Sequence, residues 1–101
     1  MFFIKAVATR LIDDTSYPEF VLCEFTDANG YNHKFVEKWP VVSEEDFENS
    51  FPKDCLLGCV IIEEKPTTYI VSTEQPWGIE SEEDISVFEI SKSQLIEEDW
   101  N

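Results

Sequence analysis

The chain has 101 residues, of which 43% are apolar and 14% aromatic. This length and composition suit one globular domain over residues 1–101 and exclude a cofactor-binding domain beside a separate substrate domain. The 22 acidic residues outnumber the 7 basic ones and give a net charge of −15, which repels phosphate backbones and anionic lipid headgroups and attracts basic surfaces. We therefore expect a basic protein as the partner, and neither nucleic acid nor membrane.

The cysteines and the N-terminal segment bear on the compartment. The chain has three cysteines, an odd number, and all three lie within apolar runs: Cys23, Cys55 and Cys59. This pattern is typical of buried free thiols in proteins of a reducing compartment. Met1 to Ala8 lacks the pattern of a signal peptide, and no apolar run approaches the roughly 20 residues of a membrane span. The sequence predicts a cytoplasmic protein and leaves its oligomeric state open.

The first half of the chain is typical of β-strands. Alternating apolar residues predict a strand over Phe2 to Ile12 with one buried face, and a polar turn over Asp13 to Pro18 follows it. Glu19 to Thr26 and Tyr31 to Glu37 are a second and a third strand. Between them, Asp27-Ala28-Asn29-Gly30 predicts a hairpin, because Asn-Gly readily adopts the positive φ angles of a tight turn.

After Trp39-Pro40 the pattern changes. Ser43 followed by three acids resembles a helix N-cap with negative charge in the first turn, so we expect a short helix over Glu44 to Ser50. Leu56 to Ile62 is a continuous β-branched apolar run, which predicts a central strand covered on both faces.

The rest of the chain is expected to be strand and loop. A turn at Lys65-Pro66 leads into a strand over Thr67 to Thr73, and the longest loop spans Glu74 to Asp84. Ile85 to Ile90 is the last clear strand, and Ser91 to Asn101 forms a turn or a short helix. No predicted helix is long enough for a parallel crossover, so about six strands should form an antiparallel small barrel or sandwich with one short helix.

Catalytic and metal-binding motifs are weak in this sequence. The single histidine, His33, lies in a hairpin strand, where it is expected to hydrogen-bond to a carboxylate or a carbonyl group rather than to activate a nucleophile. Cys55 and Cys59 lie four apart on a strand and far in sequence from His33, which is a poor ligand set for zinc. We expect no enzymatic activity, no metal and no cofactor.

Val21 to Ser43 reads VLCEFTDANGYNHKFVEKWPVVS, a hairpin followed by an exit segment. This pattern resembles one found in small β-rich bacterial proteins, several of which are immunity proteins that neutralise a cognate secreted toxin. The resemblance covers about a quarter of the chain and implies a small, acidic, cytosolic inhibitor of a basic toxin domain, with a nuclease as the expected toxin. No functional residues carry over, because immunity proteins diversify at their binding surfaces.

The predicted binding surface is the loop after the fifth strand, because loops on a rigid sheet commonly form recognition sites. It combines an aromatic side chain with carboxylates, and an acidic turn offers a second edge: Trp77, Glu80, Glu82, Glu83 and Asp84, with Glu44, Glu45 and Asp46. Two alternatives stay open at this stage. Trp77 suits closing one end of the core as well as it suits binding, and the alternative function of the whole protein is a non-catalytic small β-barrel interaction module whose acidic charge is incidental.

Overall fold

The computed structural model describes residues 1–13, 15 and 17–99, so parts of the expected turn at Asp13 to Pro18 and of the C-terminal segment lie outside the described residues. The elements in chain order are β1 (Phe2–Asp13), β2 (Phe20–Thr26), β3 (Asn32–Lys38), α1 (Trp39–Val42), β4 (Lys53–Glu64), β5 (Thr68–Ser72), β6 (Val87–Ser91), the 3-10 helix η1 (Lys92–Gln94) and β7 (Leu95–Glu97). The predicted mostly-β fold is confirmed.

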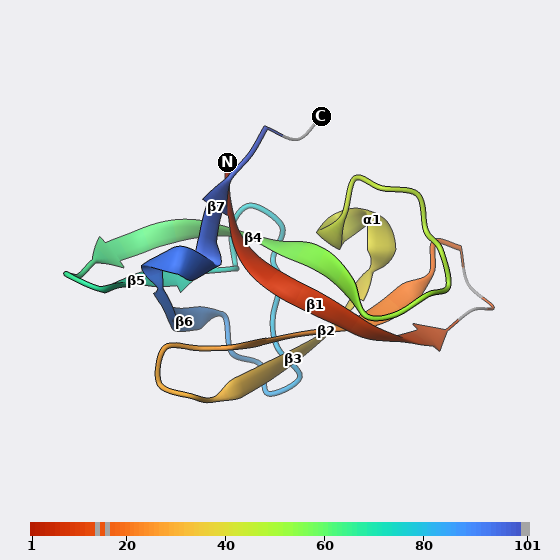
Figure 1. The fold of residues 1–101 in the computed structure, drawn as a ribbon, viewed down its shortest axis with the longest axis horizontal. Helices are drawn as coiled ribbons and strands as arrows, with labels where there is room; N and C mark the ends of the chain where they lie inside the picture. Colours follow the sequence, from red (N-terminus) through yellow and green to blue (C-terminus); the bar gives the residue numbers. More distant parts are fainter. Residues whose placement is uncertain (14, 16, 100–101) are drawn as a thin grey trace.

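The strands form one antiparallel sheet in the order β3-β2-β1-β4-β5-β6, with β7 paired to the start of β1, beyond the end of β2. The sheet curls into a half-barrel, so that its two ends approach each other (Figure 1). The backbone N–H of Ala28, at the tip of the β2-β3 hairpin, donates to the carbonyl oxygen of Glu89 in β6 at 2.9 Å. This hydrogen bond joins strands that lie at opposite ends of the sheet order.

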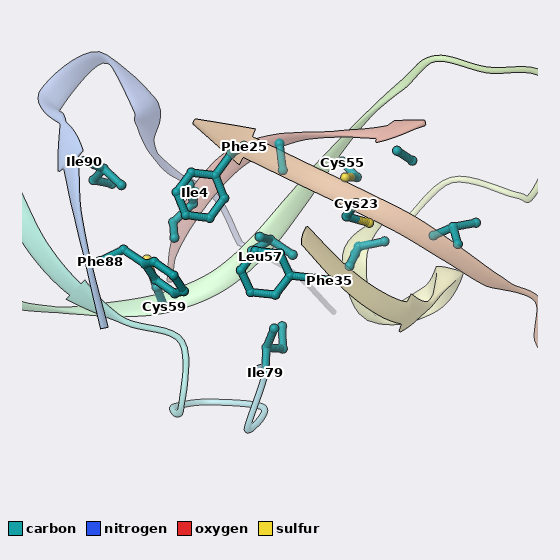
Figure 2. Close-up of a cluster of buried hydrophobic side chains, with 14 of the residues drawn as sticks. Ile4, Cys23, Phe25, Phe35, Cys55, Leu57, Cys59, Ile79, Phe88 and Ile90 are labelled. Carbon is teal, nitrogen blue, oxygen red and sulfur yellow. The ribbon is translucent and has the colours of Figure 1, made fainter. Parts of the chain in front are cut away.

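The core fills the concave side of this sheet (Figure 2). Strand alternation carries Ile4, Ala6 and Ala8 of β1 to that side, as the sequence pattern predicts. Phe88 of β6 packs against Phe25 and Phe35 of the hairpin, with ring centroids 5.2 and 5.7 Å apart. The aromatic contacts therefore connect the two ends of the half-barrel through its interior.

The hairpin between β2 and β3 follows the prediction with one difference. The N–H of Gly30 donates to the carbonyl of Asp27 at 3.1 Å, and the N–H of Asp27 donates to the carbonyl of Tyr31 at 2.8 Å. Gly30 has a φ of 88°, but Asn29 does not have a positive φ. The turn is therefore closed by one left-handed glycine instead of by two successive residues at positive φ.

The predicted helix over Glu44 to Ser50 is wrong, because the α-helix lies at Trp39–Val42 and Ser43 is its C-cap residue. Trp39 is 3% exposed and its indole N–H donates to the carbonyl oxygen of Glu45 at 2.7 Å. The Ser43 hydroxyl oxygen accepts from the N–H of Glu45 in a local turn. Burial of Trp39 fixes the path of the following loop and outweighs the favourable helix-start sequence.

The predicted burial of Leu56 to Ile62 on both faces is also wrong for its second half. Leu57 and Cys59 are buried, whereas Val60 is 41% and Ile62 57% exposed. The described chain places no layer on the convex side of the sheet there. The C-terminal segment differs too, since Leu95–Glu97 pairs with β1 as a seventh strand after η1.

Candidate partner-binding site

The long loop between β5 and β6 is fixed at its base. The Thr73 hydroxyl donates to the carbonyl of Ile79 at 2.6 Å, and the N–H of Ile79 donates to the carbonyl of Thr73 at 2.9 Å. Both residues are buried, since Thr73 is 0% and Ile79 1% exposed. These contacts close the base of the loop and hold it on the core.

Trp77, at the tip of this turn, folds over the sheet. Its ring lies 5.8 Å from that of Phe3, centroid to centroid, and a Cβ added at Gly58 would lie only 2.7 Å from the indole. The Trp77 side chain remains 38% exposed. The indole thus covers Phe3 and Gly58 on the convex side of the sheet and presents its remaining surface to solvent.

The acidic part of the loop lies elsewhere, beside β3. The N–H of Glu82 donates to the carbonyl of Lys34 at 2.8 Å. The buried Ser81 hydroxyl oxygen accepts from the N–H groups of Glu83 and Ile85 at 3.2 and 3.1 Å. The structure therefore holds the backbone of this acidic turn rigidly and leaves its side chains exposed: Glu80, Glu82, Glu83 and Asp84.

Asp84 has a φ of 61°, in the left-handed region. Asp tolerates this conformation better than most residues do, because its short side chain can hydrogen-bond locally. A hollow of about 380 Å³ beside this turn is lined by Asn32, Lys34, Ser81, Glu82 and Glu83. Its walls carry one lysine and two carboxylates, so the charge is predominantly negative.

The second predicted edge, Glu44 to Asp46, is exposed and follows α1. β3 begins next to the Glu82 turn and runs into α1, so the two acidic segments lie at opposite ends of β3. Glu44 and Glu45 border an open groove of about 780 Å³, together with Lys5, Lys53 and other residues. The predicted site residues thus fall into three separate places and do not form one cluster.

Few of the carboxylates have a cationic partner. Among the described residues, lysine ion pairs join Lys65 to Glu89 at 3.6 Å and Lys92 to Glu64 at 2.7 Å. Lys53 lies against three aromatic rings, 5.7 to 5.9 Å from their centroids. The net charge of −15 is therefore largely uncompensated by local pairing at the surface.

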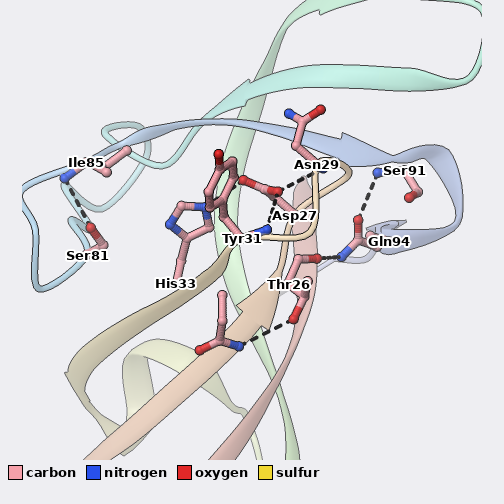
Figure 3. A network of polar contacts seen from close by, with 10 residues as sticks. Thr26, Asp27, Asn29, Tyr31, His33, Ser81, Ile85, Ser91 and Gln94 are labelled. Atoms are coloured by element: carbon pink, nitrogen blue, oxygen red, sulfur yellow. Dashed lines mark hydrogen bonds and ion pairs between the residues drawn. The ribbon is translucent and has the colours of Figure 1, made fainter.

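His33 has the role expected from its place in the hairpin. Its Nε2 lies 2.7 Å from Asp27 Oδ2, and because an ionised carboxylate only accepts, the imidazole N–H donates. Asp27 Oδ1 also accepts from the N–H groups of Asn29 and Tyr31 (Figure 3). Burial raises the pKa of Asp27, but these three hydrogen bonds outweigh it, so the pKa lies below its ordinary value.

The other imidazole nitrogen, Nδ1, is buried and has no hydrogen-bond partner among the described residues. The ring lies against Phe25 and Phe88, with centroids 5.4 and 4.7 Å away. This environment fits a structural histidine that fastens the hairpin tip. The sequence signal was the spacing of Asp27 and His33 across the Asn-Gly turn, which predicts proximity but not which atoms bond.

The three cysteines are buried free thiols, as predicted. The hydrogen bond between the Cys55 thiol and the Cys23 thiol, together with burial, raises the pKa of Cys55 strongly. Burial alone raises the pKa of Cys59 to about 12. Neither of these two thiols has the low pKa that a nucleophilic cysteine requires.

Gly58→Ala tests the packing of Trp77. The added methyl group meets the indole, so we expect the free energy of unfolding to fall by about 1–3 kcal/mol through overpacking. Urea denaturation of Gly58→Ala, Trp77→Ala and the double variant would measure this. In the Trp77→Ala background the cost of Gly58→Ala should largely disappear, and additive losses would contradict the contact.

Within residues 1–13, 15 and 17–99, no three His, Cys, Asp or Glu side chains come together as a metal site. No helix in this described part is long and apolar enough to cross a membrane.

Comparison of the chain with protein-family models, with curated proteins and with solved structures finds no match.

Proposed function

We propose that this protein is a non-catalytic inhibitor that is located in the bacterial cytoplasm. It binds a basic toxin domain, such as a nuclease, and neutralises it. The observation that carries this proposal is the net charge of −15. Within the described ranges, most carboxylates are exposed and are not in an ion pair with lysine or arginine. A field of this sign speeds the encounter with a basic protein before contact. The resemblance of the hairpin segment to immunity proteins adds the identity of the partner class.

The acidic turn at Glu82 and Glu83 is the best candidate for the first contact. Its backbone is already fixed by hydrogen bonds to Lys34 and to the Ser81 hydroxyl, so little conformational entropy is lost when a partner binds. Carboxylates displayed in this way can replace the phosphates that a nuclease recognises. Binding at this turn would thereby compete with the substrate of the partner.

Affinity capture from the native organism identifies the partner. We expect one basic protein, and we expect cells that express its toxic domain to survive only when this chain is co-expressed. Capture of no basic protein, or cell death despite co-expression, would refute the proposed function.

The kinetics of the purified pair test the role of charge. We expect the association rate constant to fall at least about tenfold between low and high salt, because screening acts over about 8 Å at physiological ionic strength. An association rate that does not change with salt would favour an interaction module whose charge is incidental.

Charge reversal then locates the first contact. Glu82→Lys/Glu83→Lys should lower affinity more than tenfold, mainly through association. Asp84 is left unchanged, since its φ of 61° disfavours lysine. Glu97→Lys/Asp99→Lys is the matched control, because both acids are exposed and two changes of +2 each take either variant from −15 to −11. Equal losses in both variants, with circular dichroism confirming the fold, would place the contact elsewhere.

A further inference from the structure

We infer that the convex face of β4, β5 and β6 carries the apolar centre of the partner interface, around Trp77, Val60, Val87 and Ile70. This inference rests on the proposed function and names the surface that holds the partner after encounter. We call these four side chains the convex patch. None of the carboxylates predicted from the sequence belongs to it.

Strand register places the four side chains on one face. The Cβ direction at Gly58 points at Trp77, and residues two apart on a strand share a face, so Val60 lies on the same side as the indole. Val60 pairs with Ser72, and Ser72 pairs with Val87. The row therefore crosses three neighbouring strands and leads from Trp77 towards the edge of the sheet.

The apolar side chains of this face are unusually exposed to solvent. Val60 is 41% exposed, Val87 51% and Trp77 38%. Ile62, which lies in the register shift of β4, adds a side chain that is 57% exposed. The buried Ser72 lies between Val60 and Val87 in the register, so the exposed valines flank it on the two neighbouring strands. Exposed apolar side chains gathered on one face of a sheet commonly mark a binding surface. They also explain why the apolar run of β4 continues beyond the part that the core buries.

Carboxylates border the patch, and one of them, Glu89, is in an ion pair with Lys65 at 3.6 Å. Ile70 lies between Glu63 on β4 and Glu89 on β6 in the sheet register. The Thr68 hydroxyl, 2.7 Å from the Glu89 carboxylate, and Lys65 lower the pKa of Glu89, so this carboxylate is charged at neutral pH. Glu74, next to Ser72 at the end of β5, is exposed. An apolar centre with a charged rim is the usual arrangement of a protein interface.

Charge complementarity selects the occupant. A second copy of this chain would bring another −15 and the same carboxylate rim against the patch. A basic protein that inserts an apolar side chain between lysines or arginines fits both the centre and the rim. We therefore assign the patch to the basic partner and not to self-association.

The experiment uses the basic protein recovered by affinity capture, purified and immobilised, with the full chain in solution. Val60→Thr/Val87→Thr replaces two methyl groups by hydroxyls without changing side-chain shape or strand preference. Val7→Thr/Val36→Thr is the matched control, because these valines are 38% and 39% exposed on β1 and β3. Circular dichroism and urea denaturation verify that all variants fold.

We expect the patch variant to dissociate at least about tenfold faster than the wild type, with an association rate within about twofold of it. The control should match the wild type in both rates. This pattern is the reverse of that expected for Glu82→Lys/Glu83→Lys, which slows association.

Two different failures can be told apart. If a basic partner binds with a salt-dependent rate and the patch variant dissociates no faster than the control, the convex patch is refuted and the proposed function stands. If no basic partner binds the wild type, the proposed function fails and the patch assignment fails with it. Concentration-dependent dimerisation of the wild type that the patch variant abolishes would instead assign the face to a second copy.

Discussion

Replacing Phe88 by alanine should lower the free energy of unfolding by roughly 3–5 kcal/mol. Phe88 is 3% exposed, and its ring contacts Phe25, His33 and Phe35 from across the half-barrel. Removal of the ring leaves a cavity between the two ends of the sheet, which the surrounding strands can fill only partly. Urea denaturation followed by circular dichroism measures the loss.

The neighbouring residue provides the control for this prediction. Val87 is 51% exposed on the opposite face of the same strand, so Val87→Ala should cost much less stability. Phe88→Leu keeps most of the buried volume and should fall between the two. A loss below about 1 kcal/mol for Phe88→Ala would mean that β6 does not close the core as the structure shows.

Asp27→Ala should be the most damaging substitution outside the apolar core, with a loss of about 3 kcal/mol in the free energy of unfolding. The Asp27 side chain is only 9% exposed and accepts hydrogen bonds from His33 and from the N–H groups of Asn29 and Tyr31. Alanine leaves His33, whose Nδ1 already has no partner in the described part of the chain, with no hydrogen bond from either nitrogen. Buried polar groups that lose their partners carry the full cost of desolvation.

The contribution of Asp27 also depends on pH. Its pKa in the folded protein lies below the ordinary value of 3.8, so its ionised form stabilises the fold. This stabilisation is complete above about pH 5 and is lost as the pH falls through the folded-state pKa. Asp27→Asn removes the titrating group with little change in shape and is the right comparison.

The measurement is urea denaturation of wild type and Asp27→Asn between pH 7 and pH 2. The difference in free energy of unfolding should shrink as the pH falls below about 4. A difference that stays constant over this range would show that the carboxylate charge does not stabilise the hairpin. A control at an exposed position of the same hairpin, Asn32→Ala, should show no such pH dependence, because the Asn32 side chain donates to the Thr26 hydroxyl oxygen, which does not titrate.

Local patterns in the sequence were sufficient for most strands. β1, β2 and β3 each alternate inward-facing apolar residues with outward-facing ones, and the turn at Gly30 sets how β2 and β3 pair. The prediction of a helix over Glu44 to Ser50 was wrong because two features of the sequence favour different structures there. The acids after Ser43 favour a helix start, but burying Trp39 contributes more free energy and depends on a surface formed by distant strands.

The candidate site was predictable only residue by residue. The acidic side chains of the long loop are exposed, as their composition indicates, because a carboxylate without a partner stays in water. Neighbours in sequence were nevertheless separated in space, since Ile79 enters the core between Trp77 and Glu82. Trp77 turns to the convex face, whereas Glu82 turns to β3.

The sequence by itself determined the antiparallel β class, the hairpin at Gly30, the burial of the three thiols and the acidic field, because these depend on local periodicity, turn chemistry and composition. Tertiary structure alone decided that Asp27 bonds His33, that Phe88 closes the half-barrel and that Val60 lies exposed beside Trp77. Each of these depends on the curl of the sheet and on which face a later segment covers. Neither quantity is encoded within a window of neighbouring residues, because both arise from contacts between strands far apart in the chain.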